Sequence, residues 1–271
     1  MSDQTLTQAI SKARQKGRVA LIPFLTGGYP DRELFWTALT ELTDSGADII
    51  EIGVPFSDPV ADGPVVAAAS LKALELGVDL KWILEGLARA KPKTPLVLMS
   101  YANPLVQYAW PKTDPGLALE TRLFESLGLL AKDALEAGVS GFIVPDVPLE
   151  EAGPFQKAFS QCGLALVPLV GPNTSLERME KYAPWASGYV YVVSVLGTTG
   201  VREGLPPETV QTLERAKKAF KLPLALGFGL RHPSQLQDLG ASPDAVIIGS
   251  ALLKHLAEGG RASEFMAPWL A

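Results

Sequence analysis

Short apolar runs recur along the whole chain, separated by longer segments in which apolar and polar positions are mixed. Most of the runs are apolar at successive positions rather than at every second one, which is typical of parallel strands covered on both faces. The pattern predicts eight strands, at Val19–Leu25, Asp48–Val54, Leu96–Tyr101, Gly141–Pro145, Ala165–Val170, Tyr189–Ser194, Leu224–Gly229 and Ala245–Gly249.

The segments between these runs have helical spacing. Several end at a glycine suited to a left-handed helix C-cap, namely Gly46, Gly77, Gly138, Gly163 and Gly240. The predicted helices are Asp31–Ser45, with Asp31 as its cap, Pro64–Leu76, Leu80–Ala90, Glu120–Ala137, Leu149–Gln161, Ser175–Tyr182, Pro207–Phe220, His232–Leu239 and Ser250–Ala257.

Eight strand and helix units without a break in composition predict one α/β domain over residues 1–271, a closed (β/α)8 TIM barrel. Two domains of ordinary size would also fit the length, but no linker separates them. An extra N-terminal helix, Asp3–Lys16, is expected to plug the bottom of the barrel. We expect Trp110–Leu119 to form a loop.

Composition narrows the class of partner. The chain has 271 residues, 47% of them hydrophobic, and a formal net charge of -5, which argues against nucleic acid as the main ligand. The N-terminus lacks a signal-peptide core and no run reaches the ~20 apolar residues of a membrane span, so a cytoplasmic protein is expected. Cys162 has no disulfide partner, and the strand ends carry no histidine cluster for a metal.

Glu51 is the residue that most needs an explanation, because it lies between Ile50 and Ile52 in a predicted strand. Burying an unpaired charge is costly. A lone strand glutamate is often a solvated edge residue, but a closed barrel has no edge, which favours a position facing a pocket. Asp62, in the sequence Asp-Gly-Pro, has two readings: a second carboxylate at the same end of the unit, or the cap of the next helix.

The strand ends predict the ligand, since active sites of this fold lie there. Aromatic residues near these ends indicate a flat apolar group, although each could simply be a core residue. Gly229, Gly249 and Ser250, in the loops of the last two strands, suit a phosphate, because glycines let backbone N–H groups approach an anion. A tight turn is the alternative for the first of these loops. The glycine- and threonine-rich segment 197–200 suits a lid.

The segment DIIEIGVPFSDPVADGP closely resembles the family of tryptophan synthase alpha subunits, and so do PFLTGGYPD, SYANPL, FIVPDVPLEEA, GTTG, GFG and IIGSA in the same order. The resemblance implies reversible retro-aldol cleavage of indole-3-glycerol phosphate to indole and glyceraldehyde 3-phosphate, without a cofactor. It implies Glu51 as the proton shuttle and Asp62 as acceptor of the indole N–H. It places Phe24, Tyr101, Tyr191 and Phe228 around the indole, Gly200, Gly229, Gly249 and Ser250 around the phosphate, and Thr199 against Asp62.

The resemblance also implies a partner, a pyridoxal-phosphate-dependent beta subunit in an alpha2-beta2 complex, contacted by residues 55–58. Two features depart from the family pattern: the segment 110–119 looks longer than usual, and Thr198 replaces a small aliphatic residue. Two other functions compete with the lyase. A different phosphosugar barrel enzyme lacks support because no strand-end lysine or metal-binding histidines are present, and a noncatalytic subunit would need neither Glu51 nor Asp62.

Overall fold

A parallel sheet forms the centre of the molecule in the computed structural model, which describes residues 2–194, 206–227, 229–238 and 243–270. Within these residues the sheet has nine strands in the order β5-β4-β3-β2-β1-β9-β8-β7-β6. They are β1 (Ala20–Thr26), β2 (Ile50–Gly53), β3 (Leu96–Met99), β4 (Val139–Ile143), β5 (Ala165–Leu166), β6 (Leu169–Val170), β7 (Val190–Val193), β8 (Leu224–Gly227) and β9 (Ala245–Ile248).

The two outermost strands, β5 and β6, are halves of one predicted strand, 165–170. Between them the Val167 N–H donates to Phe142 O of β4 at 2.9 Å, and the Pro168 carbonyl accepts the Tyr191 N–H of β7 at 2.9 Å. Proline has no N–H and so interrupts the ladder on its own strand. One segment therefore joins both ends of the sheet, and the predicted eight-stranded barrel is confirmed with its fifth strand split in two.

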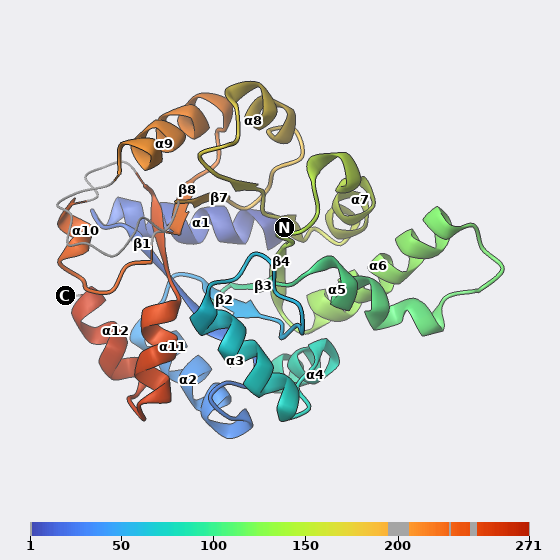
Figure 1. Cartoon of the computed structure of the whole chain (residues 1–271), viewed down its shortest axis with the longest axis horizontal. Helices are drawn as coiled ribbons and strands as arrows, with labels where there is room; N and C mark the ends of the chain where they lie inside the picture. Colours follow the sequence, from blue (N-terminus) through green and yellow to red (C-terminus); the bar gives the residue numbers. More distant parts are fainter. Residues whose placement is uncertain (1, 195–205, 228, 239–242, 271) are drawn as a thin grey trace.

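Helices surround the sheet (Figure 1). They are α1 (Ser2–Gln15), α2 (Arg32–Ser45), α3 (Pro64–Glu75), α4 (Leu80–Ala90), α5 (Ala102–Ala109), α6 (Leu119–Glu136), α7 (Gly153–Gln161), α8 (Leu176–Tyr182), α9 (Pro207–Ala219), α10 (Gln235–Asp238), α11 (Ser250–Ala257) and α12 (Ala262–Leu270), with short 3-10 helices η1 (Trp110–Lys112) and η2 (Leu149–Glu151). In the described residues, no helix is both long and apolar enough to cross a membrane.

Successive strand residues point alternately into two apolar layers, one between the sheet and the helices and one inside the barrel. Ile50 and Ile52 of β2 pack with the helices outside, whereas Ile49, the residue before this strand, belongs to the interior group of side chains. Leu6 and Ile10 of α1 belong to this interior group as well and are fully buried. The N-terminal helix thus fills one end of the barrel, as expected of a plug.

Two helices and one 3-10 turn were not predicted. α5 begins at Ala102, whose N–H is bound by the carboxylate of Asp146, far away in sequence. η1 lies inside the segment expected to be a loop, and Arg122 holds it by donating to Trp110 O at 3.3 Å and to Thr113 Oγ1 at 2.8 Å. α12 was missed because Pro268 interrupts its pattern. The predicted helix 149–161 is in fact η2 followed by α7.

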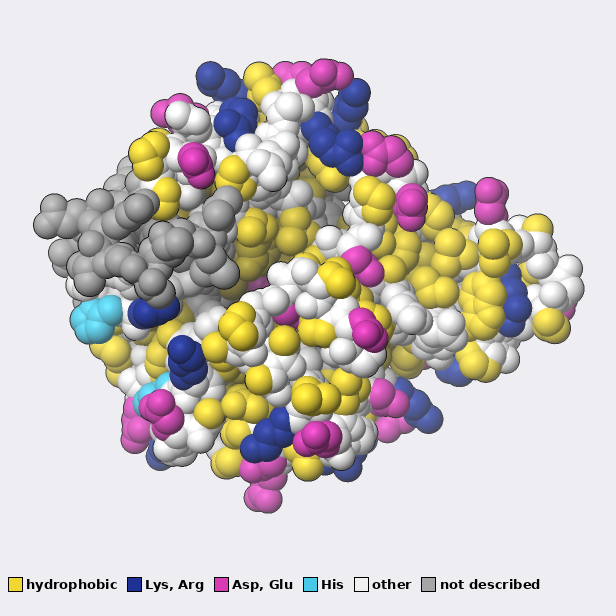
Figure 2. Space-filling model, in the orientation of Figure 1, with side chains coloured by type: hydrophobic (Ala, Val, Ile, Leu, Met, Phe, Trp, Pro, Cys, Tyr) yellow, Lys and Arg dark blue, Asp and Glu magenta, His cyan; other side chains and the backbone are white. Residues whose placement is uncertain are grey.

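Capping predictions are confirmed at the described helix ends, where Gly46, Gly77, Gly138 and Gly163 all have a positive φ, whereas Gly240 lies outside the described residues. The Asp31 carboxylate accepts the N–H groups of Glu33 and Leu34 at the start of α2, and Gly46 ends that helix with a φ of 90°. Charged side chains are scattered over the face shown in Figure 2, with acidic groups between the basic ones rather than a basic stripe. This distribution agrees with the argument against nucleic acid made from net charge.

Candidate active site

Glu51 lies on β2 beside Phe24 of β1 and Val97 of β3 in the register of the sheet. Its side chain is 0% exposed, and neither carboxyl oxygen has a hydrogen-bond partner among the described residues. Burial, and to a lesser extent the charge of Asp62, raises the pKa of Glu51 to about 8. The inward position expected for this residue is confirmed, and the carboxyl holds a proton at neutral pH.

Asp62 lies in the loop that joins β2 to α3. The cap of α3 is Gly63, and no side chain makes a capping hydrogen bond there, so the helix-cap reading of Asp62 is wrong. Burial raises the pKa of the Asp62 carboxyl, and a hydrogen bond with the Tyr101 side chain opposes that rise. Asp62 is near enough to Glu51 for its charge to raise the pKa of Glu51.

Tyr101 fixes this loop to the end of β3. Its hydroxyl accepts the Ala61 N–H at 2.9 Å and is hydrogen-bonded to the Asp62 carboxylate. Its ring stacks on Phe56, with 5.0 Å between ring centroids. Burial, with the neighbouring carboxylates adding to it, raises the pKa of Tyr101 to about 12, so the hydroxyl stays neutral and donates to Asp62.

The Phe24 ring lies inside the barrel mouth between Gly53, at the end of β2, and Gly249, which follows β9. A methyl group at Gly53 would lie 2.6 Å from the ring, and one at Gly249 would lie 3.4 Å from it. Gly53 therefore has no room for a larger side chain unless Phe24 moves, whereas a methyl group at Gly249 would make an ordinary van der Waals contact with the ring. The Tyr191 ring covers Gly227 in the same way, since a methyl group there would lie 2.6 Å from it.

The predicted phosphate residues surround the ends of β8 and β9, which are neighbours in the sheet. Gly229 has a φ of 66°, which favours glycine. Gly249 immediately precedes α11, and Ser250 begins it, with an exposed side chain. A helix start beside glycine loops is suited to an anion. Thr198, Thr199, Gly200 and Phe228 lie outside the described residues.

Comparison with known proteins decides the family. A family model described as tryptophan synthase alpha chain matches residues 10–268. The chain belongs to the tryptophan synthase alpha chain family. It is 56% identical over 268 residues to the alpha chain of Desulfovibrio desulfuricans, covering 97% of this chain and 98% of the relative. It is 53% identical to that of Nitratidesulfovibrio vulgaris, covering 99% of each.

Solved structures agree with the tryptophan synthase alpha assignment. The structure of Mycobacterium tuberculosis tryptophan synthase in its aminoacrylate-bound form is similar, with a TM-score of 0.82 and 30% identity over 98% of this chain and 96% of that one. Tryptophan synthase subunit alpha from Legionella pneumophila has a TM-score of 0.79 and 30% identity over 96% and 93%. The activity implied by the sequence is confirmed: this chain is a lyase of tryptophan biosynthesis, and the retro-aldol reaction is the activity of its family.

Two further residues belong to this site, although the motifs shared with tryptophan synthase alpha chains did not identify them. Tyr189 lies two positions before Tyr191 on the same strand face, and its hydroxyl is buried without a partner in the part of the chain that is described. Burial, followed by the charge of Glu51, raises its pKa well above the usual value. Thr26, two positions after Phe24, also has a buried, unpaired hydroxyl. The period of two along a strand was the signal that could have found both.

Proposed function

We propose that Glu51 and Asp62 together cleave indole-3-glycerol phosphate in this chain. The observation that supports this assignment is a fully buried, protonated Glu51 without a hydrogen-bond partner among the described residues, close enough to the Asp62 carboxylate to feel its charge. A structural carboxyl would normally be paired, because an unpaired one is costly. A proton donor needs a group whose pKa lies near the working pH.

Glu51 moves the proton. It donates to C3 of the indole ring, the bond between C3 and the glycerol chain then breaks, and the hydroxyl on the departing carbon becomes an aldehyde by losing its proton. The Glu51 carboxylate formed in the first step takes that proton, so the side chain ends as it began. Its pKa of about 8 lets one group act in both directions.

Asp62 stabilises the charge that forms between these two steps. Protonation at C3 makes the ring nitrogen cationic, and a carboxylate that accepts its N–H stabilises the cation. The Tyr101 hydroxyl supports this role in two ways. It donates to Asp62, which favours the ionised form, and it binds the Ala61 N–H, which fixes the loop.

The substrate is held at its two ends. The indole ring lies among Phe24, Tyr101 and Tyr191, with Phe228 added from the family pattern, which also assigns Thr199 to orienting Asp62. The phosphate binds to Gly229, Gly249, Ser250 and Gly200, where the start of α11 offers backbone N–H groups. These groups bind the part of the substrate that does not react, which positions C3 relative to Glu51.

The partner is a pyridoxal-phosphate-dependent beta subunit in an alpha2-beta2 complex in the cytoplasm. The loop 55–63 supports this assignment, because Val60 is 84% exposed on it while Phe56 stacks on Tyr101. A large apolar side chain in water favours a partner surface. A protein that covers this loop would act directly on the residue that hydrogen-bonds Asp62.

The role of Glu51 can be tested by assaying the purified chain with indole and glyceraldehyde 3-phosphate, from which it is expected to form indole-3-glycerol phosphate. Glu51→Gln cannot release or accept a proton, so turnover should fall by about a thousandfold or more, with substrate binding retained. Glu75→Gln, at an exposed glutamate on α3, is the matched control and should keep wild-type turnover. Wild-type rates in Glu51→Gln would contradict the proposed role.

Asp62→Asn tests the second carboxylate. Because Asp62 makes no capping bond with α3, this change should lower kcat by about a hundredfold or more while the Tm stays within a degree or two of wild type. Normal turnover in a destabilised Asp62→Asn protein would instead show that Asp62 has a structural role and not a catalytic one. Measuring both variants with and without a beta subunit separates catalysis from activation by the partner.

A further inference from the structure

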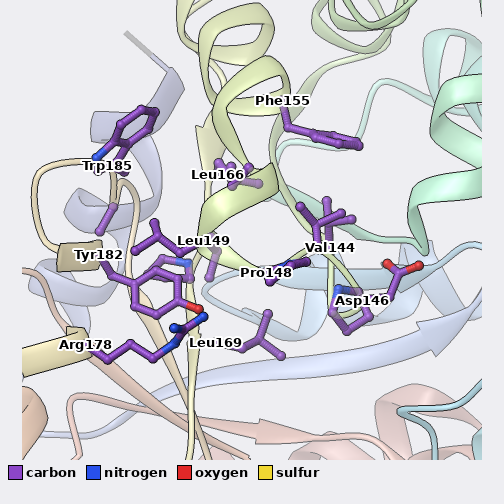
Figure 3. A pocket seen from close by; sticks show the side chains of 16 residues that line it. Val144, Asp146, Pro148, Leu149, Phe155, Leu166, Leu169, Arg178, Tyr182 and Trp185 are labelled. Carbon is purple, nitrogen blue, oxygen red and sulfur yellow. The ribbon is translucent and has the colours of Figure 1, made fainter. Parts of the chain in front are cut away.

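A second cavity lies beside the junction of β5 and β6, between η2 and α7 on one side and α8 with the loop after it on the other. Its volume is about 280 Å³. Figure 3 shows Trp185, Tyr182 and Arg178 on one side of it, and Phe155, Val144 and Asp146 on the other. Neither Glu51 nor Asp62 lines this cavity, so the proposed reaction does not use it.

The walls of this cavity are apolar. Leucine, valine and proline side chains line the cavity between the aromatic groups; Leu149, Leu166 and Leu169 are examples. Among the described residues, the buried side-chain polar atoms without a partner belong to Thr26, Glu51, Tyr189 and Arg215, and none of these lines the cavity. A ligand there need supply no hydrogen bond to an unpaired group in the wall.

The positive charge of Arg178 at the rim is already neutralised. Both terminal nitrogens of the Arg178 guanidinium donate to the Glu150 carboxylate at 2.9 Å, and the guanidinium carbon lies 5.7 Å from the centre of the Tyr182 ring. A bidentate pair of this kind leaves little attraction for a further anion. The phosphorylated substrate is therefore a poor ligand, and a neutral ring system is a good one.

Size narrows the class of ligand. Pockets for drug-sized ligands measure about 300–1,000 Å³, so this cavity accepts one small ring system. Trp185 is 43% exposed at the rim, and a flat ring placed against it would cover apolar surface that now faces water. The activity of the family releases a neutral aromatic product of this size, indole.

We propose that this cavity is a second binding site for indole, separate from the barrel mouth. The choice of ligand rests on the activity of the family, whereas the site does not depend on the roles proposed for Glu51 and Asp62.

Asp146 connects the cavity to the catalytic loop. Asp146 lines the cavity, and its carboxylate accepts the Ala102 N–H at 3.0 and 3.2 Å. Ala102 follows Tyr101, whose hydroxyl binds Asp62. An occupant in contact with Asp146 therefore changes the surroundings of the Ala102 amide. Through Ala102 and then Tyr101, this contact is linked to the Asp62 carboxylate.

Fluorine NMR of 5-fluoroindole with the full chain tests the second site. Wild type should show two bound resonances, one for the mouth and one for the cavity. Ala186→Phe, which fills the cavity from the loop after α8, should lose one resonance, and Trp185→Ala should weaken that same site at least fivefold. Leu119→Ala, at an exposed apolar residue on α6, is the control and should keep both resonances.

The amide resonance of Ala102 supplies a second readout. Titration with 5-fluoroindole should shift it in wild type, and Ala186→Phe should lose the part of that shift that accompanies the cavity resonance. Glu51→Gln should retain both fluorine resonances, so failure of the catalytic assignment and failure of this proposal are distinguishable. A single bound resonance that survives in both cavity variants would overturn the proposal, and so would two resonances that neither variant changes.

Discussion

Glu51 and Asp62 are two carboxyl groups in the same barrel mouth, and the structure holds them in opposite ways. Glu51 has no hydrogen-bond partner among the described residues, which leaves burial to raise its pKa to about 8. Burial raises the pKa of Asp62 as well, but this residue is partly exposed, and its hydrogen bond with Tyr101 opposes the rise and favours the ionised form. Environments that separate two pKa values in this way assign acid and base roles.

The raised pKa of Glu51 predicts how stability changes with pH. The folded protein binds this proton more tightly than the unfolded chain, whose pKa is near 4.5. Its stabilising contribution is therefore complete below pH 4.5 and is lost as the pH rises through about 8. Because the folded and unfolded pKa values are about 8 and 4.5, the loss at 1.36 kcal/mol per pKa unit is on the order of 5 kcal/mol.

Glu51→Gln should remove this dependence. Urea unfolding at pH 5 and pH 8 should show the free energy of unfolding falling for wild type, and falling much less for the variant. At pH 8 the variant should be the more stable of the two. Equal slopes in both proteins would show that Glu51 does not hold a proton in the folded state.

Tyr101→Phe tests the group that holds Asp62. The variant loses the hydrogen bond that lowers the pKa of Asp62, so the acid limb of the kcat profile should move to higher pH and kcat should fall by about tenfold, roughly the value of one hydrogen bond to a charged group. Tyr108→Phe is the matched control, because Tyr108 hydrogen-bonds Asp133 at 2.8 Å outside the site. A pH profile unchanged in Tyr101→Phe would contradict the proposed link.

At the scale of single elements, signals carried by neighbouring residues were predictable from sequence. The strand ranges, the Asp31 cap and the glycine that ends α2 depend on residues a few positions apart. α5 could not be predicted in this way, since its first N–H is bound by Asp146, 44 positions later in the sequence. The split between β5 and β6 depends on which neighbour each residue pairs with, which only the closed sheet determines.

The same distinction between local and long-range signals applies to the candidate site. Glu51 was predictable because a charge inside an apolar strand is conspicuous, and because a closed barrel has no edge at which that charge could be solvated. The hydrogen bonds of Tyr101 with Ala61 and Asp62 were not, because they join the ends of two different strand loops. Motifs identified the residues of the site, whereas their contacts required the fold.

Asp31→Ala tests a local element. Two N–H groups of α2 lose their acceptor, so the free energy of unfolding should fall by about 1 kcal/mol, as measured by urea denaturation. Turnover should not change, because the cap contacts no site residue in the part of the chain that is described. Asp44→Ala, at an exposed position on the same helix, should have little effect. A loss of activity without a loss of stability in Asp31→Ala would contradict this reading.

At the scale of the whole molecule, Glu41 joins the last helix to an early one. Its carboxylate accepts from Arg261 at 2.8 Å and from the Ser263 N–H at 3.0 Å, which attaches α12 to α2. Burial alone would raise the pKa of Glu41, but these hydrogen bonds outweigh it and lower the pKa. The stabilisation is therefore present above the unfolded pKa and is lost as the pH falls through the folded value.

Glu41→Ala should loosen this attachment. We expect faster amide hydrogen exchange in α12 and a loss of about 1–3 kcal/mol, the range for hydrogen bonds to charged groups, with turnover retained. Glu258→Ala, at an exposed glutamate between α11 and α12, is the control. Unchanged exchange in α12 after Glu41→Ala would show that apolar packing alone holds the helix.

The plug formed by α1 affects chemistry at the opposite end of the barrel. Leu6 and Ile10 are fully buried in the interior group of side chains, to which Phe24 and Val97 beside Glu51 also belong. The helix therefore adds to the burial of the barrel interior from the end opposite the mouth. The Glu51 side chain is already 0% exposed, and a substrate that enters the mouth displaces the water that lies nearest to it. The affinity of Glu51 for its proton should therefore rise further when the substrate binds. Water is excluded from the carboxyl by the N-terminal helix at one end of the barrel and by the substrate at the other.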